Sequence, residues 1–149
     1  MQRKNIIDLS LIELEEFCLE LGLKPFKAKQ IWNWIYCFGK TDFQEMTNLD
    51  KKTRELLNES SFIFRPKINS VHKSKDGTIK WLLEMDDKSL IETVFIPQGK
   101  RGTICISSQV GCTLSCTFCN TGTQKLVRNL STYEILGQIF TVIDHLNDW

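Results

Sequence analysis

The 149-residue sequence has no hydrophobic run that approaches the ~20 residues of a membrane-spanning helix. Its first residues also lack the apolar segment of a secretory signal, because Asp8 and several glutamates interrupt them. No internal repeat or low-complexity segment is present. We therefore expect a cytoplasmic, monomeric protein with a folded core and no membrane partner.

A strong excess of either charge is also missing. Nineteen Lys and Arg residues face eighteen Asp and Glu residues, which gives a net charge of +1 and argues neither for nor against a nucleic-acid partner. One stretch with a single acid, Asp76, gathers cationic residues: Arg65, Lys67, Lys73, Lys75 and Lys80. This stripe fits a bound polyanion and, equally, a solvated hairpin edge kept soluble by lysines.

Helical spacing of apolar residues characterises the first sixty residues. Ser10 and Glu13 form a capping box before a predicted helix that buries Cys18. Pro25 opens a second helix, and Asp50 can cap a third. The predicted buried face of the second helix contains Phe26, Ile31, Trp34, Ile35, Cys37 and Phe38.

The pattern changes after Ser60. Alternation and β-branched residues predict strands near 66–73, 78–85, 89–96 and 102–108, joined by short turns. A glycine-rich loop follows, and Ser131 with Glu134 then caps a final helix. The predicted buried face of this helix contains Ile135, Leu136, Ile139, Val142, Ile143 and Leu146.

These patterns predict an α+β protein with three parts. Residues 1–60 form a helical accessory domain, residues 61–101 a β-hairpin or linker region, and residues 102–149 a strand, a loop and a helix. Strand, loop and helix make one unit of an α/β barrel or open sheet. Because such folds need several units, we expect the chain to be the front part of a longer protein or a truncated product.

Three cysteines in the loop are spaced as C-x3-C-x2-C: Cys112, Cys116 and Cys119. Thiolates suit zinc or an iron–sulfur cluster. No second CxxC pair is available to close a four-ligand zinc site, and Cys105 lies on a predicted strand. A disulfide is a weaker alternative, since nothing indicates an oxidising compartment. Three ligands would leave one coordination position open.

The motif C-x3-C-x-aromatic-C, with Phe118 at the aromatic position, resembles the signature of radical S-adenosylmethionine enzymes. The stretch "RGTICISSQVGCTLSCTFCNTGTQKLVRNLSTYEILGQI" is similar to the RlmN/Cfr-like radical-SAM methyltransferases. That family modifies carbon 2 of adenine in 23S ribosomal RNA and, for some members, in transfer RNA. Upstream, "GLKPFKAKQIWNWIY", "FQEMTNL" and "IETVFIP" resemble the N-terminal portion of the same family.

The resemblance implies a fold, cofactors and partners. Residues 102–149 would begin a radical-SAM barrel of the TIM-like kind, and Cys112, Cys116 and Cys119 would hold a 4Fe-4S cluster. The fourth iron would bind S-adenosylmethionine, from which a reduced cluster generates a radical. Partners would be the RNA and an electron donor such as flavodoxin or ferredoxin.

Two further site residues follow from the resemblance. Cys105 matches the cysteine that resolves a protein–RNA crosslink by forming a disulfide with a methyl-bearing cysteine, which here would lie beyond Trp149. Without the resemblance, Cys105 reads as a buried strand cysteine. Glu92 matches the carboxylate that accepts a proton from the substrate carbon, and otherwise reads as an outward-facing strand acid.

Direct evidence for RNA binding is weaker in the sequence. Trp32, Trp34 and Tyr36 would stack on bases or, more ordinarily, pack in the core. Phosphates would meet three lysines in the same region: Lys24, Lys27 and Lys29. The alternative to an enzyme is a truncated, non-catalytic metal-binding or iron–sulfur RNA-binding fragment, and we expect the isolated chain to be inactive.

Overall fold

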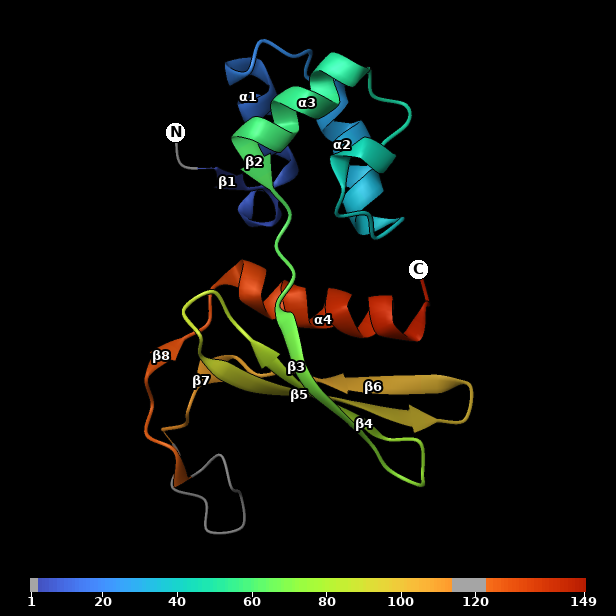
Figure 1. Cartoon of the computed structure of the whole chain (residues 1–149), viewed down its shortest axis with the longest axis vertical. Helices are drawn as coiled ribbons and strands as arrows, with labels where there is room; N and C mark the ends of the chain where they lie inside the picture. Colours follow the sequence, from blue (N-terminus) through green and yellow to red (C-terminus); the bar gives the residue numbers. More distant parts are fainter. Residues whose placement is uncertain (1–2, 114–122) are drawn as a thin grey trace. The chain divides into compact units, whose positions relative to one another are not determined.

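The computed structural model describes residues 3–113 and 123–149. The chain divides into two compact units, one of Met1–Phe64 with Leu146–Trp149 and the other of Arg65–His145. Figure 1 shows a helical first unit and a second unit built on a sheet. No helix in these described ranges is both long and apolar enough to cross a membrane.

The described residues of the first unit form three α-helices: α1 (Leu11–Glu20), α2 (Phe26–Tyr36) and α3 (Lys51–Ser60). Short 3-10 helices lie at Ile6–Asp8 and Phe43–Glu45. Strand β1 (Lys4–Asn5) pairs in parallel with β2 (Ser61–Phe62), which was not predicted. The core is apolar and contains Ile6, Leu14, Ile31, Ile35, Met46 and Leu57.

Helix starts in this unit follow the predicted capping chemistry. Ser10 and Glu13 form the reciprocal capping box of α1, and the Asp50 carboxylate accepts from the Thr53 amide at the start of α3. Each arrangement satisfies amides that have no partner inside the helix. Cys18 is fully buried, as predicted.

The predicted buried face of α2 was wrong at its two ends. Cys37 is exposed, and Phe26 and Phe38 are each 57% exposed. The structure buries Ala28, Ile31 and Ile35, which recur at three- and four-residue spacing along one narrow stripe. Cys37 caps the helix end beyond that stripe and therefore faces solvent.

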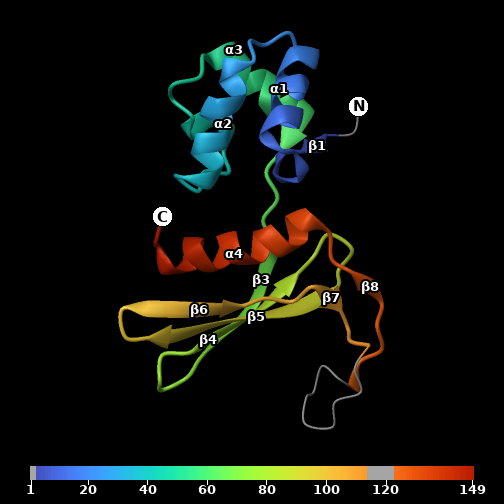
Figure 2. The same ribbon diagram turned by 180° about the vertical axis from the view of Figure 1, so that it is seen from behind.

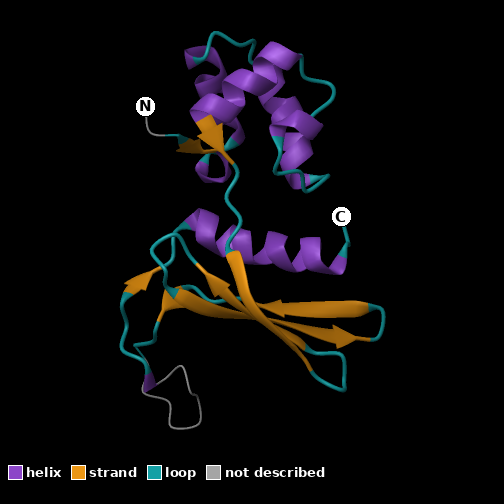
Figure 3. Cartoon of the chain, viewed as in Figure 1, coloured by secondary structure: helices purple, strands orange, loops and turns teal. Residues whose placement is uncertain are grey.

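The described part of the second unit contains a four-stranded antiparallel sheet in the order β3-β4-β5-β6. Its strands are Lys67–Lys73, Ile79–Glu84, Leu90–Gln98 and Arg101–Cys105, close to the predicted ranges. Helix α4 (Thr132–Leu146) runs across one face of the sheet in both views (Figures 1 and 2). A short antiparallel pair of strands, β7 (Gln109–Val110) and β8 (Arg128–Asn129), lies beside the four-stranded sheet (Figure 3).

Strand register separates the two faces of the sheet. Trp81 lies opposite Thr93, and Leu83 lies opposite Ile91; all four side chains are buried on the side of α4. Side chains alternate along a strand, so the intervening residues point to the other side. We call this second side the open face, and it carries Lys80, Leu82, Glu92, Val94 and Cys105.

The expectation of a barrel unit needs correction for the part of the chain described. No barrel is formed by these residues, and the strand predicted over 102–108 ends at Cys105 as the antiparallel edge of the sheet. A tight turn at Gln98–Arg101 returns the chain directly onto β5, which produces an antiparallel neighbour. The broad α+β class was correct.

Candidate functional site

Glu92 and Cys105, the two predicted catalytic residues, lie on neighbouring strands. Cys105 on β6 is the register partner of Val94 on β5, and Val94 is two residues after Glu92. Residues two apart on a strand share a face. The sheet therefore places the Glu92 carboxylate and the Cys105 thiol on the open face as diagonal neighbours.

The Glu92 carboxylate is exposed and forms an ion pair with Lys80. Nζ of Lys80 lies 2.9 Å from Oε1 of Glu92, and both side chains are about half exposed. The Ser107 hydroxyl donates to the Glu92 backbone carbonyl at 2.8 Å, which extends the pairing of this segment with β5 beyond Cys105. Glu92 is thus outward-facing, as an ordinary strand acid would be.

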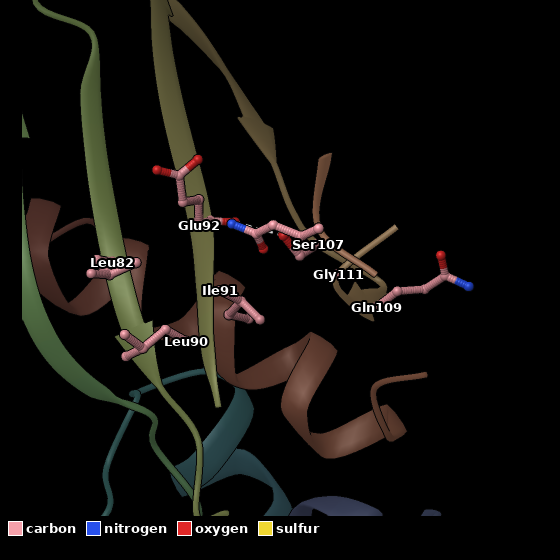
Figure 4. Close-up of a pocket in the computed structure, with 8 residues that line it drawn as sticks. Leu82, Leu90, Ile91, Glu92, Ser107, Gln109 and Gly111 are labelled. Carbon is pink, nitrogen blue, oxygen red and sulfur yellow. Dashed lines mark hydrogen bonds between the residues drawn. The ribbon is translucent and has the colours of Figure 1, made fainter. Parts of the chain in front are cut away.

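A cavity of about 230 Å³ lies beside Glu92. Figure 4 shows the Glu92 side chain on its strand, with Ser107 and Gly111 on the neighbouring segment. The cavity is lined by Leu82, Leu90, Ile91, Glu92, Ser107, Gln109, Gly111 and Gln124. It therefore connects the open face with the segment that precedes Cys112.

Cys105 is exposed, so the alternative of a buried strand cysteine is wrong. The four cysteines in the described residues are reduced: Cys18, Cys37, Cys105 and Cys112. No disulfide therefore joins them. An exposed thiol at a strand end is accessible to a reaction partner, which is the property that a resolving cysteine requires.

Cys112 is the one cluster cysteine within the described residues, because Cys116 and Cys119 fall in the range 114–122. It is half-buried and forms an isolated bridge with Lys125. Gly111 precedes it with φ of +77°, and a Cβ at Gly111 would overlap the carbonyl oxygen of Lys125. Glycine is therefore required where the two limbs of this segment approach each other.

No group of three or more His, Cys, Asp or Glu residues that could hold a metal ion occurs within residues 3–113 and 123–149. Only one of the three predicted ligands lies in these ranges. The metal assignment therefore remains a prediction.

Glu134 on helix α4 takes part in a buried ion pair, whereas the sequence predicted only a helix-capping role for this residue. The Glu134 carboxylate is buried and accepts two hydrogen bonds from the Arg128 guanidinium, at 2.7 and 2.8 Å. Arg128 also donates to Asp87, at 2.7 Å. The hydrogen bonds from Arg128 are the main reason why the pKa of Glu134 lies below its ordinary value.

Gln138, one turn later on α4, is fully buried and also escaped prediction. Its Oε1 accepts from the Thr93 hydroxyl at 2.9 Å and from the Ser107 amide at 2.8 Å. Its Nε2 donates to the Ser107 carbonyl at 2.9 Å and to the Glu134 carbonyl at 3.2 Å. A lone amide within the apolar run "ILGQIFTV" was the available signal.

Some cations proposed for RNA contacts are engaged within the protein. The Lys27 ammonium pairs with Asp50 and donates to Thr53, and Arg65 pairs with Asp144 at 2.9 Å. The side chains of other cationic residues remain exposed: Lys24, Lys29, Lys67, Lys73 and Lys75.

Three aromatic residues of α2, Trp32, Trp34 and Tyr36, are half-buried. Trp32 stacks with Tyr36 at a centroid distance of 4.2 Å, and the Trp34 indole donates to Asn48. These contacts occupy part of each ring surface that base stacking would need.

The first unit matches a known family. Residues 4–63 match the model described as the ribosomal RNA large subunit methyltransferase N-terminal domain. The crystal structure of a radical SAM methyltransferase from Sphaerobacter thermophilus superimposes on the chain with a TM-score of 0.88 and 34% identity. This match covers 97% of the present chain and 43% of that protein.

Curated relatives agree with this match. The chain is 48% identical to the dual-specificity RNA methyltransferase RlmN of Rhodospirillum rubrum, a match that covers 97% of the chain and 34% of the relative. The proteins of the same name from Rhodopseudomonas palustris and Paracoccus denitrificans are 46% and 48% identical, covering 99% and 98% of the chain and 39% and 38% of the relatives. The chain thus spans 34–39% of the length of these three relatives. Over nearly its whole length, the chain is therefore similar to the N-terminal portion of the RlmN dual-specificity RNA methyltransferases.

Proposed function

We propose that this chain is the N-terminal part of a cytoplasmic radical S-adenosylmethionine methyltransferase that methylates carbon 2 of adenine in 23S ribosomal RNA and in transfer RNA. The observation that carries the proposal is the placement of Glu92 and the exposed Cys105 on one open face, beside the segment that contains Cys112. Their sequence spacing, together with the family match, supports assigning roles to them.

In this proposal Cys112, Cys116 and Cys119 hold a 4Fe-4S cluster. The thiolate donor set suits iron, and the partly exposed Cys112, on the turn that follows Gly111, fits a ligand that must reach a group outside the sheet. When bound, a cluster with one open iron supplies the electron that cleaves S-adenosylmethionine to a carbon-centred radical. Flavodoxin or ferredoxin would supply reducing equivalents.

Glu92 and Cys105 act on the RNA in this scheme. Adenine carbon 2 is electron-poor and reacts poorly with a sulfonium methyl group, which is why radical chemistry is required. The Glu92 carboxylate accepts the proton that leaves this carbon. The Cys105 thiolate then attacks the sulfur of the methyl-bearing cysteine beyond Trp149, whose methyl carbon has become bonded to the RNA. The S–S bond forms as the S–C bond of this crosslink breaks, and the electron pair stays with the carbon, which takes up a proton to become the new methyl group.

The parts of the chain have separate tasks in this proposal. Residues 1–60 act as an accessory domain that contacts RNA, residues 61–101 lead into the catalytic part, and residues 102–149 begin the radical-SAM core. Lys24, Lys29, Lys67, Lys73 and Lys75 are exposed and therefore remain available for phosphates.

Anaerobic reconstitution of the chain with iron and sulfide tests the proposal. We expect about four irons per chain, and a change in the EPR signal of the reduced cluster when S-adenosylmethionine is added. That change requires an open iron. Stoichiometric zinc without iron, or a cluster that S-adenosylmethionine leaves unchanged, would favour the non-catalytic metal-binding fragment.

A further inference from the structure

Two short limbs flank residues 114–122 and are joined by backbone hydrogen bonds. Residues 107–112, which precede this range, contain β7, and residues 123–131, which follow it, contain β8. The Cys112 amide donates to the Gln124 carbonyl at 3.1 Å, and the Val127 amide donates to the Val110 carbonyl at 2.9 Å. We call these segments the upstream and downstream limbs.

Gln138 holds the upstream limb. Its side-chain amide accepts from the backbone N–H of Ser107 and donates to the backbone carbonyl of the same residue. An antiparallel strand pairs with a residue through the same two bonds. Gln138 therefore occupies the place of a neighbouring strand at the point where β6 has ended, and it leaves no buried amide group of its own without a partner.

Glu134 holds the downstream limb. Its carboxylate accepts both bonds from Arg128, on β8, and also accepts from the amide and hydroxyl of Ser131, at 2.8 and 3.0 Å. The carboxylate is only 3% exposed, so its charge is compensated almost entirely by these donors.

Glu134 and Gln138 are four residues apart and therefore share one face of α4. We propose that these two side chains are positioning residues that fix both limbs on α4 and thereby set the position of Cys112. The inference rests on the proposed function only for the iron that Cys112 binds. Because both limbs are fixed, Cys112 already lies in its final position before a metal ion binds.

Simple helix docking is the competing explanation. In that explanation Gln138 only helps to pack α4 against the sheet. Packing of a helix requires buried apolar area, which α4 already supplies through Phe140 and Val142. A docking role predicts that removal of the Gln138 amide loosens the sheet and the limbs equally. The positioning role predicts a local effect on the bonds that join the limbs.

Hydrogen exchange in Gln138→Met separates the two explanations. The measured amides are those of Cys112 and Val127, since neither bonds to the substituted residue, and the amide of Met85 reports on the sheet through its bond to Ser89. We expect exchange at Cys112 and Val127 to accelerate about tenfold or more relative to Met85. Equal acceleration at all three amides, or none, would overturn the proposal.

Thr141→Val is the matched control on the same helix. Thr141 is buried, and its hydroxyl donates to the Gly137 carbonyl within α4 rather than to a limb. Valine has nearly the same shape and lacks this hydrogen bond. We expect the ratio of limb to sheet exchange to remain within about twofold of that in the native protein. A ratio that rises as much as in Gln138→Met would contradict the assignment.

Gln138→Glu provides a test by rescue. A protonated carboxyl group can accept from the Ser107 amide and donate to its carbonyl, whereas an ionised carboxylate has no proton to donate. Relative to Met85, and after correction for intrinsic rates, the limb amides should be protected at pH 5 and lose at least about tenfold protection at pH 8. The native chain, which has the same Glu134 and Arg128, should show no such change. Equal protection of the limb amides at pH 5 and pH 8 in Gln138→Glu would contradict the proposal.

Iron binding supplies the second readout. After anaerobic reconstitution, Gln138→Met and Glu134→Gln should retain less than about half of the iron absorbance of the native chain, and Thr141→Val should match it. Failure of every variant and of the native chain to bind iron would reject the proposed function while leaving the exchange result intact. Full iron binding in both positioning variants would reject the proposal.

Discussion

The Nζ atom of Lys80 lies 2.9 Å from Oε1 of Glu92, across the two central strands of the sheet. Lys80 is the register partner of Val94, so its contact with Glu92 runs diagonally over the open face. The pair brings a fixed positive charge next to the carboxylate to which we assign proton acceptance. Variants of Lys80 can therefore probe Glu92, provided that they leave the fold intact.

We expect Lys80→Gln to leave the fold intact. Both side chains of the pair are about half exposed, and exposed ion pairs contribute at most about 1 kcal/mol to the free energy of unfolding. Chemical denaturation of Lys80→Gln, Glu92→Gln and the double variant measures the coupling. A coupling energy above about 2 kcal/mol would mean that the pair is a structural element.

The cysteines should differ sharply in reactivity. Burial raises the pKa of the Cys18 thiol to about 11, whereas Cys37 and Cys105 are exposed. A thiol with that pKa is only about 0.1% thiolate at pH 8, and burial also blocks access. With iodoacetamide at pH 8, Cys18 should react at least about 100-fold more slowly than Cys105, as measured by peptide mass spectrometry.

The control for this reactivity is the same reaction in concentrated guanidinium, where the two rates should converge. Comparable rates for Cys18 and Cys105 in the native chain would contradict the burial of Cys18.

Gly111→Ala should destabilise the second unit more than Gly99→Ala. Both glycines have positive φ, +77° and +62°, but only at Gly111 does an added Cβ overlap a backbone carbonyl, that of Lys125. We expect Gly99→Ala to lower the free energy of unfolding by about 1 kcal/mol, from backbone strain alone. Gly111→Ala should lower it by roughly 3 kcal/mol, because overpacking adds to the strain. Chemical denaturation gives both values. If both variants lost the same free energy of unfolding, the two limbs would be able to move apart at Gly111 without cost.

Stability should fall in acid partly because of Glu134. Its pKa is lowered in the folded protein, chiefly by Arg128, so the unfolded chain takes up this proton at a higher pH than the folded one does. The stabilisation is therefore present above the ordinary pKa, near 4.5, and is lost as the pH falls below it. Glu134→Gln should cost about 2 kcal/mol at pH 7 and should flatten the loss of stability between pH 5 and 3.

The pH dependence has an internal comparison. Asp87 also has a lowered pKa, chiefly because of its hydrogen bond from Arg128, and it remains in Glu134→Gln. The variant should therefore keep part of the acid sensitivity. A variant with the full native slope between pH 5 and 3 would show that Glu134 is not the group responsible.

Local patterns predicted the elements of the fold well. The capping box of Ser10 and Glu13 located a helix start, and the short turn predicted between 78–85 and 89–96 located a hairpin, because both depend on neighbours in the sequence. The position of Cys105 on a strand was also predicted. Its exposure was not, since a strand pattern does not say which neighbour covers an edge.

Helix α4 illustrates what periodicity cannot supply. Its predicted apolar face was only partly right. Val142 is buried, and the other five residues are half-buried: Ile135, Leu136, Ile139, Ile143 and Leu146. The structure instead buries Glu134 and Gln138. Their partners lie outside the helix: Arg128 precedes Glu134 by 6 residues and Ser107 precedes Gln138 by 31, so the hydrophobic spacing of the helix carries no signal for either contact.

The parallel pair of β1 and β2 has a consequence for engineering. Lys4 is the register partner of Ser61, and the Arg3 guanidinium donates to the Ser61 carbonyl at 2.6 and 2.9 Å. The chain thus enters and leaves the three-helix segment at adjacent points. Such a segment can be spliced as a cassette into a surface loop of a host protein without stretching either junction, and its own ends can be joined by a short linker to create new termini elsewhere.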